Sequence, residues 1–444
     1  MAYKLHFISL GCAKNMVNCE QMMASVQAAG HTIQAQPEGA DVVVVNTCGF
    51  LASACEEAIE NILEMAELKK AGQVKKILVT GCMTQRYKED IFHELPEVDG
   101  LLGTGSYGDI ATAIAEVMEK GEKPCHLGNI HTANQSGERI LSTPPRYAYL
   151  RIAEGCDNCC AYCVIPRLRG RYRSREMASL LEEARALSDA GVKELIVIAQ
   201  DITKYGMDLP EHKRLLPELL RELCKMDFTW IRLHYLYPDQ ITDELIDVIA
   251  DEPKIVKYLD IPLQHVSKRI LRAMHRPGDG AEFTRLIEDM RERIPGLVLR
   301  TSLIVGLPGE TEDEFAELCE FLQNVGIERV GVFEYSPEEG TEAAELPDQI
   351  DDETKQNRRL IVEELQSGVL DDYNTSRHGE VMQVLCEGFD PDMGCYAGRS
   401  CADSPDVDGK VFFTAAGLVP AGTFVNVRIT GTEDGDLMGE IEEA

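Results

Sequence analysis

The sequence predicts an α/β protein of three domains, and three observations support this prediction. Short apolar runs alternate with helical patterns from residue 4 to about 124, and the alternation resumes with new strands between about 146 and 373. Such alternation predicts parallel sheets with helices on their faces. From residue 377 onward, short alternating runs are separated by Gly, Pro and Asp, which predicts a small antiparallel β-barrel. We expect the domains to span residues 1–125, 142–373 and 377–444.

Composition favours a large enzyme. At roughly 150 residues per domain, the 444 residues correspond to about three domains, and 44% of them are hydrophobic. The N-terminus lacks the apolar stretch and cleavage site of a signal peptide, and no apolar run reaches the length of a membrane span. The odd count of 15 cysteines predicts reduced thiols and metal ligands rather than a disulfide framework. We therefore expect a cytoplasmic protein without membrane contact.

The charge balance bears on the partner. The formal net charge is -32, from 44 basic and 76 acidic side chains. Extended nucleic-acid binding needs Lys and Arg to neutralise phosphates, so this balance disfavours it. A basic protein is the partner that such a surface favours.

Three cysteines occupy matching places in the first domain. We predict strands at residues 5–10, 41–46 and 76–80, and helices at 16–29, 53–70 and 109–120. Cys12, Cys48 and Cys82 each follow the carboxyl end of one of these strands. Such ends share one edge of a parallel sheet, where ligands bind. One such cysteine would be an ordinary buried residue, but three predict a metal cluster that leaves one iron without a protein ligand.

The segment 103–108 fits the pattern GxGxxG of dinucleotide-binding proteins. That pattern belongs to the first strand–helix turn of its fold, and Cys12 occupies the first turn here. We interpret these glycines as a tight turn rather than a nucleotide site.

A second cysteine set lies at the start of the central domain. Cys156, Cys160 and Cys163 form a CxxxCxxC loop, whose three thiolates suit three corners of an iron–sulfur cube and leave the fourth iron open. A structural zinc loop is the alternative, but zinc sites usually have four protein ligands, and no fourth Cys or His follows closely. Cys159 has the wrong spacing for a ligand and is interpreted as a bystander.

The central domain predicts six strand–helix units, too few for a closed eight-stranded barrel. The expected strands are residues 148–153, 194–199, 230–235, 258–261, 298–305 and 329–335. In barrels of this kind chemistry occurs on loops at the carboxyl ends of strands. The CxxxCxxC loop follows the first strand, and two further strand ends carry Gln200-Asp201 and Gly306, a glycine that permits close backbone approach.

The cysteine loop resembles those of the radical S-adenosylmethionine (radical SAM) enzymes. The segments SLGCAKNMVNCE, NTCGF and TGC, together with that loop, resemble the methylthiotransferase family within this class. The resemblance implies a partial (β/α)6 barrel, S-adenosylmethionine, an electron donor and two 4Fe-4S clusters. It assigns the auxiliary cluster to Cys12, Cys48 and Cys82, and the radical SAM cluster to Cys156, Cys160 and Cys163. It also implies cosubstrate contacts by Tyr162, Gln200, Asp201, Ile304 and Gly306.

Five arginines lie within residues 167–175, directly after the cysteine loop. Alone, such a run indicates nucleic-acid binding. Arginines also pair with the protein's own carboxylates or hold an acidic substrate side chain, and the acidity of the chain favours this second interpretation.

The C-terminal segment resembles the TRAM module that ends methylthiotransferases. Residues 377–444 carry four Arg or Lys against thirteen Asp or Glu, a balance of 4 - 13 = -9 that would repel phosphates and attract a cationic protein. The runs IPRLRGRYRSR, YLDIPLQHVSKRILRAMHRPG and ADSPDVDG resemble the branch that modifies an aspartate β-carbon of the basic small-subunit ribosomal protein S-twelve. The alternatives are the branch that modifies isopentenylated adenosine in tRNA, and a non-catalytic protein that only donates sulfur.

Overall fold

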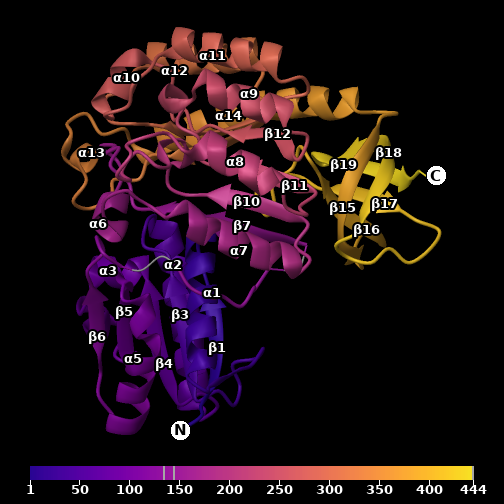
Figure 1. Cartoon of the computed structure of the whole chain (residues 1–444). Helices are drawn as coiled ribbons and strands as arrows, with labels where there is room; N and C mark the ends of the chain where they lie inside the picture. Colours follow the sequence, from indigo (N-terminus) through magenta and orange to yellow (C-terminus); the bar gives the residue numbers. More distant parts are fainter. Residues whose placement is uncertain (134–135, 144–145, 443–444) are drawn as a thin grey trace. The chain divides into compact units, whose positions relative to one another are not determined.

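A computed structural model describes residues 1–133, 136–143 and 146–442 (Figure 1). The expected central domain begins just before residues 144–145, and the expected C-terminal domain ends at 443–444; both pairs lie outside the described residues. The chain forms two compact units. The first contains Met1–Ser142, Arg151–Ser179 and Ser336–Ala344, and the second contains Thr143–Leu150, Leu180–Tyr335 and Glu345–Ala444.

The first unit is built on a six-stranded parallel sheet of order β2-β1-β3-β4-β5-β6. Its strands are β1 (Lys4–Ser9), β2 (Thr32–Ile33), β3 (Val42–Thr47), β4 (Lys76–Gly81), β5 (Gly100–Gly105) and β6 (Cys125–Gly128). Its helices are α1 (Ala13–Ala28), α2 (Ala52–Lys70), α3 (Cys82–Tyr87), α4 (Asp90–Glu94) and α5 (Ile110–Ala115), and a π turn continues α5 over Glu116–Lys120.

Helices cover both faces of this sheet. Val43 and Val45 of β3 pack in a core with Ile62 of α2, whereas Val42 and Val44 pack on the other side with residues of α1 and α5. Successive strand side chains point to opposite faces. A continuous valine run therefore indicates a strand buried on both sides, as in parallel sheets.

The sequence did not predict β2, β5 or β6. Strand β5 reads GLLGTG, and glycine is depleted in strands. Gly103 and Gly105 lie inside this strand, so the interpretation of these two glycines as a tight turn was wrong. A Cβ at Gly103 would lie 2.2 Å from Gln85 Oε1, and one at Gly105 would lie 2.7 Å from Leu127 O. Glycine is present there because the neighbouring segments pack closely on the strand.

The second unit contains a six-stranded sheet of order β14-β13-β12-β11-β10-β7, and the pairings from β10 to β14 are parallel. Its strands are β7 (Tyr147–Arg151), β10 (Glu194–Ile198), β11 (Trp230–Leu233), β12 (Ile255–Asp260), β13 (Val298–Val305) and β14 (Arg329–Glu334). The helices are α7 (Met177–Asp189), α8 (Leu216–Cys224), α9 (Asp243–Asp251), α10 (Lys268–Ala273), α11 (Gly280–Arg293), α12 (Glu312–Val325) and α14 (Asp352–Ser376). This is the expected partial barrel of strand–helix units.

The C-terminal segment forms a closed five-stranded barrel of order β15-β16-β17-β19-β18 (Figure 1). Its strands are β15 (Val381–Asp390), β16 (Cys395–Ser400), β17 (Val411–Thr414), β18 (Phe424–Glu433) and β19 (Asp436–Ile441). Four of the pairings are antiparallel, and β17 pairs with β19 in parallel.

This small barrel packs at the amino ends of the sheet strands of the same unit. Trp230, Val256 and Val298, at or next to the first positions of β11, β12 and β13, share a core with Leu385 of β15. The Trp230 and Phe424 rings meet edge to face at 4.7 Å. Apolar burial of this kind fixes the barrel to the sheet.

Buried ion pairs reinforce the same joint. Glu194, the first residue of β10, accepts from Arg232 Nε and Arg399 Nη2, both at 2.7 Å. Burial raises the pKa of Glu194, but Arg399 and Arg232 outweigh it and hold that pKa below its ordinary value. The carboxylate is therefore fully matched by protein cations.

Two aspartates of the ADSPDVDG turn belong to this joint. Asp403 is 2% exposed and pairs with Arg329 Nη2 at 2.9 Å, and Asp408 accepts from the Tyr258 hydroxyl at 2.6 Å. The acidic total of the C-terminal segment counts both as charges that attract a basic partner, and for these two residues that interpretation is wrong. Of the three aspartates in the turn, Asp403, Asp406 and Asp408, Asp406 is the exposed one.

In the described part of the chain, no helix is long and apolar enough to cross a membrane.

Candidate functional site

The three strand-end cysteines lie on neighbouring strands of the first unit. Cys12 is the N-cap of α1, two residues after Leu10, Cys48 follows β3 directly, and Cys82 begins α3 directly after β4. Strands β1, β3 and β4 are adjacent in the sheet, and their carboxyl ends share one edge. The fold therefore places the three thiols where the sequence predicted.

Glycines bring the three cysteine loops into contact. A Cβ at Gly11 would lie 2.8 Å from Cys48 Cβ, and Gly11 has a φ of +83°. A Cβ at Gly49 would lie 2.6 Å from the carbonyl carbon of Cys82. Approaches under 3.0 Å are closer than real Cβ atoms come, so a side chain at either position would push the loops apart. Gly11 and Gly49 thus allow the three cysteine loops to pack closely.

The thiols differ in their electrostatic surroundings. Burial raises the pKa of Cys82 to about 11, although the positive charge of Arg169 opposes this. Burial likewise raises the pKa of Cys48. Cys12 is exposed. Neighbouring protein atoms disfavour its thiolate, but Lys14, Arg169 and backbone N–H groups outweigh this effect and lower the pKa. Cys12 is thus the thiol most readily ionised for metal binding, because metals bind the thiolate.

Asn15 was not predicted as a site residue. It is 0% exposed in the first turn of α1, and its Nδ2 donates to Thr47 O at 2.9 Å and Leu10 O at 3.2 Å. The Cys82 thiol donates to Asn15 Oδ1 at 3.8 Å. Asn46 Nδ2 donates to Asn15 O at 2.8 Å. The available signal is an amide side chain three residues after Cys12. The buried face of the helix also carries Lys14, Asn18 and Glu20, so a polar side chain there does not by itself mark a site.

The CxxxCxxC loop also belongs to the first unit. It runs from β8 (Ala153–Glu154) to α6 (Ile165–Arg169), and Gly155 turns it with a φ of +79°. The Asn158 N–H donates to Cys156 Sγ at 3.4 Å, and the Ile165 N–H donates to Cys163 Sγ at 3.4 Å. Backbone donors to sulfur stabilise thiolates, as iron–sulfur binding requires.

The middle cysteines of this loop differ in exposure. Cys160 is buried, whereas Cys159 is exposed and has a φ of +51°. Cys12, which is assigned to the other cysteine set, is exposed as well, so the interpretation of Cys159 as a bystander stays a prediction.

Helix α6 connects the two cysteine sets. Val164, the residue after Cys163, packs with Leu168 against Cys82. Thr104 Oγ1 of β5 donates to Leu168 O at short range. The loop with one cysteine set therefore leads directly into a helix that contacts the other set.

Two of the five arginines after the loop, Arg169 and Arg175, are buried, whereas Arg167 and Arg171 are exposed. Arg169 is 3% exposed, and its Nη1 donates to Glu154 Oε2 at 3.0 Å and Asn18 Oδ1 at 3.1 Å. Arg175 Nη1 donates to Arg151 O at 3.0 Å. This supports pairing with the protein's own acceptors over a phosphate-binding surface.

The expected cosubstrate residues of the second unit lie at strand ends. Gln200 and Asp201 follow β10, and Asp201 is buried and accepts from the Thr203 N–H at 3.0 Å. Ile304 lies in β13, and Gly306 follows that strand. Gly306 has a φ of +72°, and a Cβ there would lie 2.3 Å from Lys355 Cγ of α14. Close packing of Lys355 therefore explains this glycine without any ligand.

Tyr162 lies in the cysteine loop of the first unit and is half-buried. Each of the expected cosubstrate residues thus occupies a strand-end or loop position within its own unit.

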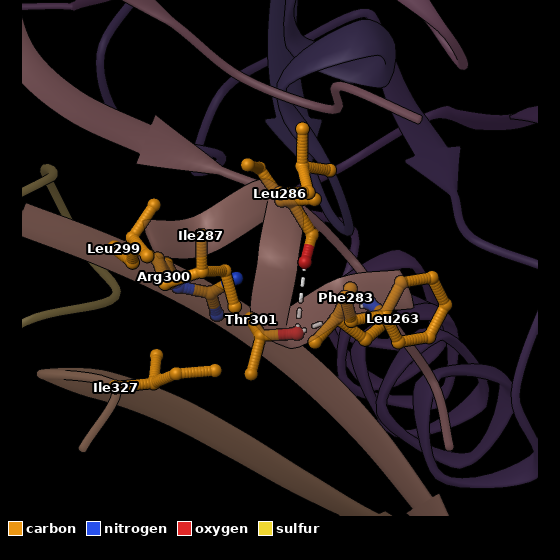
Figure 2. A pocket seen from close by; sticks show the side chains of 9 residues that line it. Leu263, Phe283, Leu286, Ile287, Leu299, Arg300, Thr301 and Ile327 are labelled. Carbon is orange, nitrogen blue, oxygen red and sulfur yellow. Dashed lines mark hydrogen bonds between the residues drawn. The ribbon is translucent and has the colours of Figure 1, made fainter. Parts of the chain in front are cut away.

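A small cavity in the second unit is not a functional candidate. Its volume is about 10 Å³, and its lining from α11, β13 and adjacent segments is mostly apolar (Figure 2). Thr301 Oγ1 donates to Ile261 O at 2.8 Å and accepts from the Leu263 N–H at 3.1 Å, so the one hydroxyl there is satisfied (Figure 2). The cavity is a packing gap in the core.

Within the described ranges, no three His, Cys, Asp or Glu side chains are drawn together as for a single metal ion. The cysteines fit an iron–sulfur cluster through their spacing, through the backbone donors to sulfur and through the convergence of three strand ends.

Three family matches cover most of the chain. Residues 4–103 match the uncharacterized protein family UPF0004, residues 150–322 match the radical SAM superfamily, and residues 379–441 match the TRAM domain. The chain is therefore a radical SAM enzyme, a class that uses an iron–sulfur cluster and S-adenosylmethionine.

Solved structures support the same fold. The radical S-adenosylmethionine methyltransferase TsrM from Kitasatospora setae matches with a TM-score of 0.57 at 15% identity, covering 74% of this chain and 73% of that chain. The cobalamin-dependent S-adenosylmethionine radical enzyme OxsB matches with a TM-score of 0.51 at 11% identity, covering 83% of this chain and 56% of that chain. At such identity the likeness extends to the fold alone.

Curated relatives match over the whole length. The ribosomal protein uS12 methylthiotransferase RimO of Lachnoclostridium phytofermentans is 46% identical and covers 99% of this chain and 100% of its own length. The RimO proteins of Pelotomaculum thermopropionicum and Myxococcus xanthus are 47% and 45% identical, over 99% of this chain and 99% and 92% of their own lengths. The chain belongs to the RimO family of ribosomal protein uS12 methylthiotransferases.

Proposed function

We propose that this chain adds a methylthio group to the β-carbon of an aspartate in ribosomal protein uS12, the S-twelve protein of the small subunit. The observation that carries the proposal is the placement of six cysteines in one compact unit, with α6 joining the CxxxCxxC loop to the converged strand ends. A site for radical generation beside a site for sulfur suits a reaction that inserts sulfur into an unactivated C–H bond. Full-length relatives with this activity in their names support the same choice.

We assign two 4Fe-4S clusters to the two cysteine sets. Cys156, Cys160 and Cys163 hold the first cluster, and Cys12, Cys48 and Cys82 hold the second. When bound, the first cluster would supply the electron that cleaves one S-adenosylmethionine to methionine and a radical able to remove the β-hydrogen, and the second would present the sulfur, which takes its methyl group from a second S-adenosylmethionine. The hard chemistry belongs to the cofactors.

The protein's own residues position and shield these groups. The loops of Gly11 and Gly49 pack the strand-end thiols together, and backbone donors at Asn158 and Ile165 hold the loop thiols. We assign cosubstrate contacts to Tyr162, Gln200, Asp201, Ile304 and Gly306. The buried Asp201 is fixed by the Thr203 N–H, so its carboxylate needs little reorganisation to accept a further donor.

The exposed acids of the small barrel are assigned to recruiting the basic substrate. The side chains of Asp403 and Asp408 are buried in the joint and do not belong to this surface. Exposed carboxylates lie at Asp392, Asp406, Glu433, Asp434 and Glu440. Such a surface attracts a cationic protein and repels a phosphate backbone. Because the substrate belongs to the ribosome, we assign the reaction to the cytoplasm. There a reduced one-electron donor protein would supply electrons to the clusters.

The test uses anaerobically reconstituted enzyme with S-adenosylmethionine and a reductant. It is incubated separately with uS12 protein and with isopentenylated tRNA, and both products are examined by mass spectrometry for an added methylthio group. We expect the group on one aspartate of uS12. Modification of tRNA alone would overturn the proposed substrate, and cleavage of S-adenosylmethionine without any methylthio product on either would overturn the proposed reaction.

A further inference from the structure

Arg169 is a buried cation with few charged partners. It ends α6, and its guanidinium donates to Glu154 Oε2, to Asn18 Oδ1 and, at short range, to Asn15 Oδ1. Glu154 also accepts from Arg151 Nη1 at 2.8 Å, so it neutralises Arg169 only in part. Burying a guanidinium costs several kcal/mol unless its surroundings compensate. A buried arginine with a shared carboxylate therefore needs a second source of negative charge.

The strand-end cysteines lie beside this cation. Arg169 and Cys82 share one acceptor, Asn15 Oδ1, and Leu168, the residue before Arg169 in α6, packs against Cys82. A guanidinium stays charged in proteins. A fixed positive charge therefore lies next to the place where the strand-end thiolates would hold a cluster.

Asn15 fixes the geometry between the cation and the thiols. Its Oδ1 accepts both from Arg169 Nη2 and, at 3.8 Å, from Cys82 Sγ. Its Nδ2 is held by Thr47 O at 2.9 Å. Because both ends of the amide are engaged, the guanidinium is held at a constant place relative to the strand-end thiols.

Arg169 is also linked to the other cysteine set. Glu154, which pairs with Arg169, also accepts from the Gly155 N–H at 3.2 Å through Oε1, and Gly155 precedes Cys156. The guanidinium is therefore anchored in the CxxxCxxC loop and acts at the strand ends.

We propose that Arg169 is a positioning residue whose fixed positive charge raises the reduction potential of the iron–sulfur cluster at Cys12, Cys48 and Cys82. The inference rests on the proposed function, which places a cluster there. Cluster potentials depend on net charge, on hydrogen bonds to sulfur and on solvent exposure. A cluster bound by three thiolates gains a negative charge on reduction, and a buried cation nearby stabilises that reduced form.

The experiment uses the full chain with Cys156, Cys160 and Cys163 replaced by Ala, so that only the strand-end cysteines remain to hold a cluster. Into this parent we introduce Arg169→Gln, Arg169→Lys and, as matched control, Arg171→Gln, because Arg171 is exposed in the same segment. After anaerobic reconstitution, iron and sulfide are counted, and the cluster is titrated with reductant under electron paramagnetic resonance.

We expect Arg169→Gln to bind the cluster with a more negative midpoint potential. A tenfold weaker reduction equilibrium corresponds to about 59 mV for one electron, and we expect a shift of at least this size. Arg169→Lys, which keeps the charge, should stay closer to the parent, and Arg171→Gln should match it.

The outcomes separate this inference from the proposed function. If the parent chain never binds iron, the assignment of a second cluster to Cys12, Cys48 and Cys82 is wrong, and the inference falls with that part of the proposed function. A parent that binds a cluster whose potential is the same in Arg169→Gln would overturn the inference alone. If Arg169→Gln fails to fold, Arg169→Met serves as the variant without charge. Equal midpoint potentials in Arg169→Lys and Arg169→Met would then overturn the inference.

Discussion

Each unit of the molecule buries a group of charged side chains, and the two groups lie at opposite ends of their sheets. In the first unit Arg169 and Glu154 lie beside cysteines at the carboxyl ends of β1, β3 and β4. In the second unit Glu194 and Arg232 lie at or near the starts of β10 and β11, against the C-terminal barrel. Carboxyl ends of strands carry chemistry in such folds, and amino ends contribute stability.

The difference lies in what balances the charge. At the strand starts, Glu194 is matched by Arg232 and Arg399, so the group is complete without a ligand. At the strand ends, Arg169 shares the Glu154 carboxylate with Arg151, and it shares the acceptor Asn15 Oδ1 with Cys82. A buried charge matched by protein groups indicates a structural role, whereas one held beside the cysteines proposed to bind a cluster supports a functional role.

The largest expected effect distinguishes the two cysteine sets. Cys160→Ala should abolish both cleavage of S-adenosylmethionine and methylthiolation, because radical generation needs the loop cluster. Cys48→Ala should abolish methylthiolation while retaining cleavage, measured as release of methionine and 5'-deoxyadenosine. Complete loss of cleavage in a folded Cys48→Ala protein would show that the two sites do not divide the work in this way.

Gly49→Ala tests whether convergence of the strand ends is needed. The added methyl group would lie 2.6 Å from the Cys82 backbone and force the loops apart. By carry-over of two four-iron clusters we expect about eight irons in the wild-type chain and about half that number in the variant. Gly72→Ala, at a glycine with open space around it, is the control for handling losses, although its φ of +74° adds some strain.

Glu194→Gln tests the strand-start group. Removing one charge from a buried ion pair leaves its partners uncompensated and costs about 3–5 kcal/mol. We expect a lower free energy of unfolding in denaturant, with cleavage per folded molecule little changed. Glu211→Gln, at an exposed pair, should leave the unfolding curve in place. A specific loss of cleavage in folded Glu194→Gln would assign a functional role to the strand starts.

Acid stability tests a buried titratable group in the second unit. Burial lowers the pKa of His265 from 6.5 to about 4, so the folded chain keeps this ring neutral. The unfolded chain binds the proton more readily between these values, so stability is present above pH 6.5 and is lost as pH falls toward 4. From pH 7 to pH 5 this one group should cost about 2 kcal/mol. His265→Asn should lose less stability over that range; an identical loss would exclude His265 as the cause.

The smallest expected effect concerns the acidic surface. Asp434→Asn combined with Glu433→Gln and Glu440→Gln should weaken uS12 binding a few-fold and reduce its salt dependence, because exposed charges are screened within about 8–10 Å. Asp403→Asn, at a buried pair, should instead lower stability. If Asp403→Asn weakens binding without loss of stability, the assignment of Asp403 to the joint is wrong.

The two cysteine sets could be proposed from the sequence because their signals are local. Cys156, Cys160 and Cys163 are close in the chain, and Cys12, Cys48 and Cys82 each follow a recognisable strand. The network around them could not be predicted, because Arg169 meets Asn15 across 154 positions of sequence.

Charge counting failed for a similar reason. Asp403 and Asp408 contribute to the acidic total of the C-terminal segment. Only the fold shows that Asp403 pairs with Arg329 and that Asp408 accepts a hydrogen bond from Tyr258. The glycine-rich strand β5 was missed because its strand structure comes from neighbouring strands rather than from its own residues.

The C-terminal barrel is attached at the strand starts, a full strand length from the carboxyl ends of the same sheet. Strand β13 runs for eight residues from Val298, which contacts the barrel core, to Val305 beside Gly306. At about 3.3 Å per residue the strand measures roughly 26 Å. A partner held by the small barrel would have to extend at least this far to reach the carboxyl ends of the same sheet, where the proposed cosubstrate residues Ile304 and Gly306 lie. If the small barrel holds uS12 as proposed, intact uS12 should be a better substrate than a short peptide around the aspartate.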